Sequence, residues 1–202
     1  MNNPGQKIIQ VIFLLLFIFL LYMGRIRIWM IIFITGVVLA VLWGRFYCGW
    51  ICPINTVTQA ITGIKKKLGI KDISTPAFIK NPFFRYIVLA LFIGIFIFIK
   101  VSGKQLPVLP ALFLIGLVLS IIFSEKLWHR YLCPYGTILN LVSGKAGRSP
   151  AIDAHRCSQC GLCIAICPAD AIVEEDVYHI EKKECLQCGE CIRRCSKEAI
   201  SF

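Results

Sequence analysis

Acidic residues are scarce in the first 150 residues of the sequence. This stretch contains Asp72 and Glu125 against 16 lysines and arginines, and charged residues make up 16% of the 202-residue chain. No Asp, Glu, Lys or His falls near the middle of a long apolar segment. That absence argues against a proton pump, an ion-coupled transporter or a bis-histidine haem, because each needs such side chains at that depth.

Nucleotide and haem motifs are also missing. The sequence has no C-x-x-C-H haem-attachment motif, no G-x-G-x-x-G dinucleotide loop and no G-x-x-x-x-G-K-S/T phosphate loop. The net charge is +11, but no soluble basic stripe with interleaved aromatic residues accompanies it, so we expect no nucleic-acid partner. Hydride transfer and ATP chemistry are not expected, and whether the chain is itself an enzyme stays open.

Long apolar segments dominate what is present, and hydrophobic residues make up 57% of the chain. Four of these segments predict membrane-spanning helices, because each is close to the length needed to cross a hydrocarbon core about 30 Å thick. They cover residues 8–24, 28–44, 83–99 and 106–124. The first has only Lys7 before it and no A-x-A-like cleavage site after it, so we expect an uncleaved span rather than a signal peptide.

Basic residues concentrate in the connection between the second and third predicted spans. Residues 45–81 carry Arg45, Lys71 and four further lysines, whereas the tight connections on the other face carry two basic residues each, Lys104 among them. This excess predicts a multi-pass protein of the inner (cytoplasmic) membrane with both termini and the C-terminal domain in the cytoplasm. For segment 55–71 we expect either a helix on the membrane surface that attracts anionic membrane lipid, or charge that serves only topology.

Composition changes sharply after the last predicted span. A connector at 143–150 follows a helical domain at 1–142, and a charged, cysteine-rich domain occupies 151–202. This last domain contains eight of the eleven cysteines in two copies of one motif, offset by 28 residues. The copies are CSQCGLCIAICPADAI from Cys157 and CLQCGECIRRCSKEAI from Cys185.

Each copy reads C-x-x-C-x-x-C-x-x-x-C, a spacing in which three thiolates hold one [4Fe-4S] cluster and the fourth reaches the other cluster. We therefore predict two clusters. The first has the ligands Cys157, Cys160, Cys163 and Cys195, and the second has Cys185, Cys188, Cys191 and Cys167. Zinc is an alternative, but zinc sites usually pair two C-x-x-C knuckles rather than place four cysteines in one run. Disulfides are a second alternative, which a reducing cytoplasm disfavours.

The two repeats resemble bacterial two-cluster ferredoxins. The resemblance implies a pseudo-twofold fold with short strands near 151–153, 171–174, 177–180 and 199–202. The predicted fold class is thus a membrane α-helical bundle of four transmembrane helices, followed by a small α+β two-[4Fe-4S] ferredoxin-like domain.

The remaining three cysteines lie at the cytoplasmic ends of predicted spans. Cys48 and Cys52 occur in RFYCGWICP after the second span, and Cys133 occurs in WHRYLCPYG after the fourth, where His129 precedes it. Thiolate and imidazole are both iron ligands, so these four side chains form a candidate third site. Three interpretations stay open: a third iron-sulfur cluster, a redox-active or copper-binding thiol site, or helix ends shaped by the prolines that follow two of the cysteines. For His129, a place at the membrane interface beside the neighbouring tryptophan is an equal alternative.

The four spans, the two cysteine-proline motifs and the terminal repeats together resemble the membrane-bound polyferredoxin family of NapH-type four-span iron-sulfur proteins. That family commonly has cysteine at both positions of the second motif, where this sequence has His129 and Cys133. The resemblance implies an electron-transfer subunit of an oxidoreductase system. Such a subunit relays electrons between the quinone pool or a membrane partner and another redox protein.

Quinol is therefore a possible partner, and its candidate surface is the interface around Trp43, Arg45, Trp50 and Arg130. The competing hypothesis is a copper-handling or metalloenzyme assembly factor that uses the membrane-face thiols, because soft thiolates suit Cu(I). This second hypothesis resembles related membrane ferredoxins that reduce copper.

Overall fold

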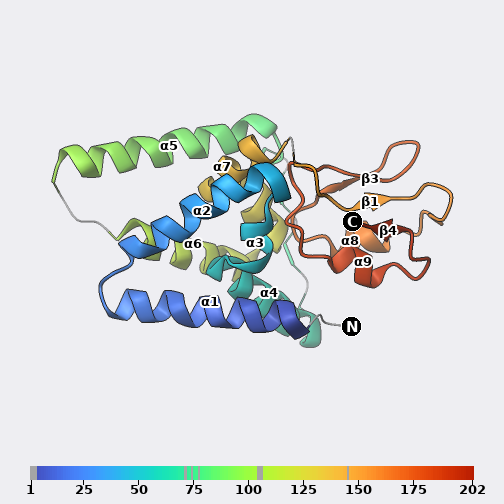
Figure 1. Ribbon diagram of the computed structural model, residues 1–202, viewed down its shortest axis with the longest axis horizontal. Coiled ribbons are helices and arrows are strands. Elements are labelled where there is room, and N and C mark those ends of the chain that lie inside the picture. The colour runs from blue at the N-terminus through green and yellow to red at the C-terminus, as the bar shows by residue number, and fades with distance from the viewer. Residues whose placement is uncertain (1–3, 71, 74, 77, 104–106, 145) are drawn as a thin grey trace.

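The computed structural model describes residues 4–70, 72–73, 75–76, 78–103, 107–144 and 146–202. Some residues used above lie outside this described part, namely Lys71, Lys104, Leu106 at the start of the fourth predicted span, and Lys145 of the connector. A bundle of helices forms one end of the molecule, and a smaller unit that contains the strands forms the other (Figure 1).

Helices joined by loops are the main elements of the described chain as far as residue 143. They are α1 (Pro4–Tyr22), α2 (Arg27–Trp43), α3 (Phe46–Trp50), α4 (Pro53–Lys67), α5 (Pro82–Val101), α6 (Val108–Ile122), the π-helix η1 (Leu127–Leu132) and α7 (Pro134–Ser143). Helices α1, α2, α5 and α6 coincide with the four predicted spans. Of these, α1 is long and apolar enough to cross a membrane, whereas α2, α6 and the Phe83–Ile99 part of α5 are apolar but shorter. The helical character is as predicted, and the four-span arrangement stays a prediction.

Prolines begin the helices that follow two of the cysteines. Pro53 is the first residue of α4 and Pro134 the first of α7. Proline suits this position because it has no N–H to leave unbonded, and its ring disfavours helical geometry at the residue before it. Cys52 and Cys133 accordingly have extended backbones, with ψ of 119° and 109°. Both cysteines therefore lie at a junction between two helices.

Helix α4 does not lie apart on a surface, because it packs against both α1 and α6. Its polar residues Thr58, Thr62 and Lys65 are buried. The Lys65 Nζ donates to the carbonyl oxygens of Ser120 and Phe123 at 3.3 and 3.2 Å, which satisfies acceptors at the end of α6. Of the two alternatives given for segment 55–71, attraction of anionic lipid is therefore wrong for Lys65, whose ammonium is buried and acts as a structural cation.

The smaller unit has the α+β fold expected of a two-cluster ferredoxin. Its strands are β1 (Ala151–Ile152), β2 (Ile172–Val173), β3 (His179–Ile180) and β4 (Ile200–Ser201), and its helices are α8 (Leu162–Ile166) and α9 (Glu190–Arg194). Strand β1 pairs antiparallel with β4, and β2 with β3. All four strands fall within the predicted ranges, and α9 begins 28 residues after α8, which is the offset of the sequence repeat. We refer to residues 151–202 as the ferredoxin-like unit.

One hydrophobic core runs through the junction between the helices and the ferredoxin-like unit. It contains Phe33 and Ala40 of α2, Leu139 of α7, and Ala171 and Leu186 of the unit. Burial of apolar area on both sides of the junction stabilises the docked arrangement. The unit is thus packed on the end of the bundle that carries the cysteine-proline motifs.

Candidate iron-sulfur centres

Each predicted set of ferredoxin cysteines lines a cavity of its own. The cavity of the first set is lined by Cys157, Cys160, Cys163 and Cys195. The cavity of the second set is lined by Cys167, Cys185, Cys188 and Cys191. In each, three cysteines come from one repeat and the fourth from the other, as the spacing predicts; we call these the cluster-1 and cluster-2 cavities.

Backbone amides point at several of these sulfurs. The amide of Ala171 donates to the Sγ of Cys167 at 3.2 Å, and the amide of Ala199 donates to the Sγ of Cys195 at 3.4 Å. Donors of this kind favour thiolate, which is the form that binds iron. The donor atoms and the cavities therefore fit [4Fe-4S] clusters.

The two ferredoxin-type cavities differ in burial. Cys160 of the cluster-1 cavity is exposed, whereas Cys185 and Cys188 of the cluster-2 cavity are buried. Burial raises the pKa of Cys185 to about 11, while the backbone N–H of Leu162 lowers the pKa of Cys160. Cluster 1 would therefore lie near the surface of the unit, and cluster 2 near the helices.

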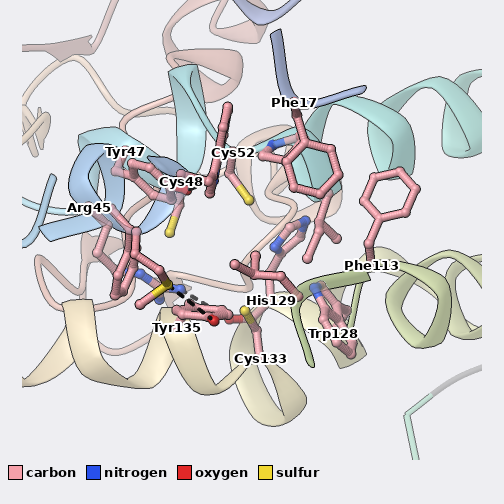
Figure 2. A pocket seen from close by; sticks show the side chains of 16 residues that line it. Phe17, Arg45, Tyr47, Cys48, Cys52, Phe113, Trp128, His129, Cys133 and Tyr135 are labelled. Atoms are coloured by element: carbon pink, nitrogen blue, oxygen red, sulfur yellow. Dashed lines mark hydrogen bonds between the residues drawn. The ribbon is translucent and has the colours of Figure 1, made fainter. Parts of the chain in front are cut away.

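A third cavity, at the end of the bundle, brings together Cys48, Cys52, His129 and Cys133 (Figure 2). Cys48 belongs to α3, His129 belongs to η1, and the other two residues precede α4 and α7. The cavity volume is about 20 Å³, the same as that of each ferredoxin-type cavity. Most of the remaining wall is aromatic, with Phe17, Trp29, Phe33, Tyr47, Phe113, Trp128 and Tyr135. We refer to this space as the membrane-face cavity.

Burial disfavours charge on the thiols of the membrane-face cavity. It raises the pKa of Cys48 and that of Cys133, the latter to about 12, while the nearby Arg45 guanidinium opposes both shifts. Among the described residues, no three His, Cys, Asp or Glu side chains converge closely enough to hold a single metal ion. A single zinc ion would need each ligand atom within about 2.3 Å of the metal.

His129 is held in one tautomer by Thr58, which the sequence did not suggest as a site residue. Its Nε2 lies 3.2 Å from the Oγ1 of Thr58. That hydroxyl donates its one hydrogen to the carbonyl of Asn55 at 3.0 Å, so it accepts from His129 and leaves the Nδ1 lone pair for a metal. Burial, together with the positive charge of Arg45, lowers the pKa of His129 to about 3. The imidazole is therefore neutral, which is the form that binds metals.

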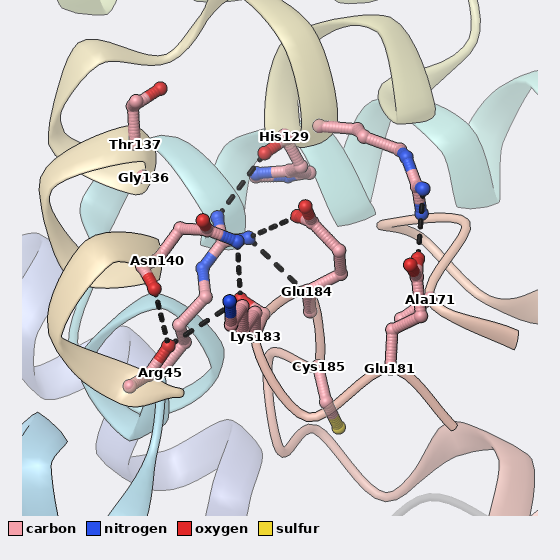
Figure 3. A network of polar contacts seen from close by, with 12 residues as sticks. Arg45, His129, Gly136, Thr137, Asn140, Ala171, Glu181, Lys183, Glu184 and Cys185 are labelled. Atoms are coloured by element: carbon pink, nitrogen blue, oxygen red, sulfur yellow. Dashed lines mark hydrogen bonds and ion pairs between the residues drawn. The ribbon is translucent and has the colours of Figure 1, made fainter. Parts of the chain in front are cut away.

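Arg45 lies between the membrane-face cavity and the ferredoxin-like unit and is fully buried, with 0% of its surface exposed (Figure 3). Its Nη1 is 3.1 Å from the Oε2 of Glu184, and its Nη2 donates to the carbonyl of His129 at 3.2 Å. Arg85 pairs with the same carboxylate. Burial opposes ionisation of Glu184, but the hydrogen bond from Arg85 and the positive charges of Arg45, Arg85 and Arg130 outweigh it and hold its pKa below the usual range. Arg45 therefore does not belong to an accessible quinone surface, and that part of the prediction is wrong.

The membrane-face motif touches the cluster-2 cysteine loop directly. A Cβ placed on Gly49 would lie 2.1 Å from the carbonyl oxygen of Leu186, so only glycine fits there. The indole Nε1 of the next residue, Trp50, donates to the carbonyl of Gln187 at 3.0 Å. Leu186 and Gln187 lie between Cys185 and Cys188. Two cysteine motifs far apart in the sequence are thus in backbone contact.

These cavities and this fold define the class as a helical iron-sulfur protein with a ferredoxin-like domain. A family model described as a 4Fe-4S binding domain matches residues 28–71 and 105–150, which include all four predicted residues of the membrane-face cavity. A second model, described as a 4Fe-4S dicluster domain, matches residues 133–200. The chain belongs to the polyferredoxin family.

Several relatives support this membership. The chain is 31% identical over 155 residues to an uncharacterised protein of Methanocaldococcus jannaschii, a match that covers 73% of the chain and 61% of that protein. It is 30% identical to the ferredoxin-type protein NapH of Haemophilus influenzae, over 72% of the chain and 54% of that protein. It is 29% identical to the methylamine utilization ferredoxin-type protein MauN of Methylorubrum extorquens, over 64% of the chain and 50% of that protein. The chain thus spans little more than half the length of these relatives, and no solved structure matches it.

Proposed function

We propose that the chain is a membrane-bound iron-sulfur electron carrier, which relays electrons between the quinone pool or a membrane partner and another redox protein. The observation that carries the proposal is the series of cysteine-lined cavities among the described residues. It runs from the membrane-face cavity through the buried cluster-2 cavity to the cluster-1 cavity. Clusters bound there would supply reversible one-electron transfer.

In this proposal the chain crosses the inner membrane four times and keeps both termini and the ferredoxin-like unit in the cytoplasm. Exposed apolar side chains on all four long helices support it, because such surfaces are stable in lipid rather than water. Examples are Ile12 on α1, Ile31 on α2, Leu91 on α5 and Val118 on α6. The lysine-rich connection after α2 supports the orientation.

In this proposal, four residues of the membrane-face cavity would be the ligands of a third cluster. Cys48, Cys52 and Cys133 would provide thiolates, and His129 would provide the Nδ1 of a neutral imidazole. The aromatic wall excludes water, which strengthens electrostatic interactions inside the cavity. The contact of Gly49 with Leu186 brings this site against the loop that holds the second cluster.

A copper-handling or assembly role is the second candidate. It is favoured by the concentration of soft donors, because the thioether of Met30 lines the same cavity as the three thiols and such ligands suit Cu(I). In that case the ferredoxin-like unit would serve to reduce the bound metal.

Stopped-flow reduction of the oxidised holoprotein by a water-soluble quinol, in detergent and without oxygen, tests the proposed function. We expect quinol to bleach the visible cluster absorption rapidly in the wild-type protein and more slowly in Cys133→Ser. Dithionite should still reduce the ferredoxin-type clusters of Cys133→Ser, which shows that those clusters are intact. No reduction by quinol would contradict the quinone link. Stoichiometric Cu(I) binding without loss of iron would favour the copper-handling role.

A further inference from the structure

We propose that Arg45 is a positioning residue shared by two redox sites, which supplies the positive charge facing the membrane-face cavity and fixes the cluster-2 cysteine loop against it. The inference rests on the proposed function, because it assumes an iron-sulfur group in that cavity. It goes further in assigning to one buried side chain both the charge balance of that group and its coupling to the next cluster.

The protein around the Arg45 guanidinium is shaped to accommodate it. An arginine stays charged at any physiological pH, and burying a charge is costly unless the surroundings compensate for it. Arg45 is nevertheless fully buried. A Cβ on Gly136 would lie 2.7 Å from its Nη2, so the first turn of α7 leaves room for the guanidinium.

The charges around Arg45 do not balance within the protein. Arg45 and Arg85 share the single carboxylate of Glu184, which leaves one positive charge in excess in this buried cluster. The Nε of Arg45 is buried without a hydrogen-bond partner, and Arg45 lines the membrane-face cavity. Buried donors without partners are rare, and a thiolate-ligated iron-sulfur group, which carries net negative charge, would supply the missing acceptor and charge.

The same side chain is tied to the second cluster site. Arg45 Nη1 donates to the Glu184 carboxylate at 3.1 Å and lies 3.4 Å from the Glu184 carbonyl oxygen. Glu184 immediately precedes Cys185, and Arg45 stands three residues before Cys48. One guanidinium therefore holds the backbone next to a predicted ligand of each site.

Three variants of the full chain, purified anaerobically in detergent, test the inference by iron content and by amide hydrogen exchange of residues 183–188. Arg45→Met removes both the positive charge and the hydrogen bonds that Nη1 and Nη2 of the guanidinium donate. Arg45→Lys keeps the positive charge but not this pair of donors. Lys126→Gln is the control, because Lys126 pairs with Asp170 at 2.8 Å across the same junction but does not line the cavity.

For Arg45→Met we expect iron to fall from about 12 to about 8 per chain, with the ferredoxin-type EPR signals retained, and exchange to become about tenfold faster. Arg45→Lys should keep its iron but exchange faster, and Lys126→Gln should change neither. If Arg45→Met keeps its full iron content and its amide exchange rate is unaltered, the inference about Arg45 is wrong but the proposed function is not. If Arg45→Met does not fold, unaltered exchange in Arg45→Lys would overturn it instead. A wild-type content of about 8 iron would overturn the proposed third cluster as well, which separates the two failures.

Discussion

The hydroxyl of Thr58 decides which nitrogen of His129 is free to bind a metal. It donates to the carbonyl of Asn55 and so accepts from the imidazole. Ligating histidines generally donate their other ring N–H in this way, and loss of the acceptor weakens metal binding about 10–100-fold. Thr58 lies on α4, far in sequence from His129, so its role becomes visible only in the folded chain.

Replacing Thr58 tests this assignment. Thr58→Val keeps the shape of the side chain but removes the acceptor, so we expect the membrane-face iron to be lost to a ferrous chelator about 10–100 times faster. The rate of chelation, followed optically, measures this. Thr35→Val is the control, because the hydroxyl of Thr35 bonds only within α2, to Ile31. Equal rates in Thr58→Val and wild type would contradict the role of Thr58.

Replacing His129 by cysteine tests ligation itself. Imidazole in place of thiolate raises the potential of an iron-sulfur centre, so His129→Cys should keep the iron and lower the midpoint potential of the membrane-face centre. His129→Ala should lose that centre. EPR-monitored redox titration measures both outcomes. A potential unchanged in His129→Cys would mean that His129 does not bind the metal.

At the scale of elements, α3 and the cluster-2 loop meet backbone to backbone. The side chains of Gln6 and Gln10 of α1 donate to the carbonyl of Gly49 at 3.2 and 2.8 Å, which holds this short helix in place from the other side. Because α3 is fixed on both sides, the position of Cys48 relative to the Leu186 loop is set by packing rather than by a flexible connection.

A methyl group at Gly49 should loosen this contact. Gly49→Ala places a Cβ 2.1 Å from the carbonyl oxygen of Leu186, so we expect a destabilisation of about 1–3 kcal/mol from overpacking, seen as a lower unfolding temperature. Gly63→Ala in α4 is the matched control, since its Cβ meets nothing within 4 Å. That control should be stabilised by roughly 0.5–1 kcal/mol. Equal unfolding temperatures for the two variants would argue against a tight contact at Gly49.

Local sequence was sufficient for features that depend on spacing. The cysteine repeat predicted two sets of four cysteines, and each set lines one cavity. The strands were implied by the resemblance to two-cluster ferredoxins, and the prolines after Cys52 and Cys133 indicated helix ends. Local sequence was not sufficient for Arg45 and Glu184, which are separated by 139 positions, because no short-range pattern encodes a partner so distant. The pairing of Arg85 with the same buried carboxylate was missed for the same reason.

At the scale of the whole molecule, the ferredoxin-like unit is held on the helices by apolar and ionic contacts together. Lys126 pairs with Asp170 and Arg130 with Glu181, both at 2.8 Å, at the edge of the buried core. Such partly exposed pairs contribute little energy individually, so they serve chiefly to orient a unit that apolar burial stabilises. The arrangement fixes the order of the cavities from the membrane-face end to the exposed cluster-1 end.

The most direct test of the central claim is the amount of iron and acid-labile sulfide per chain in wild-type protein purified without oxygen in detergent. Three clusters predict about 12 iron and about 12 sulfide per chain, and two clusters predict about 8 of each. The account predicts about 12 of each. A content of about 8 would contradict the third cluster, and far less iron with zinc in its place would contradict the electron-carrier account.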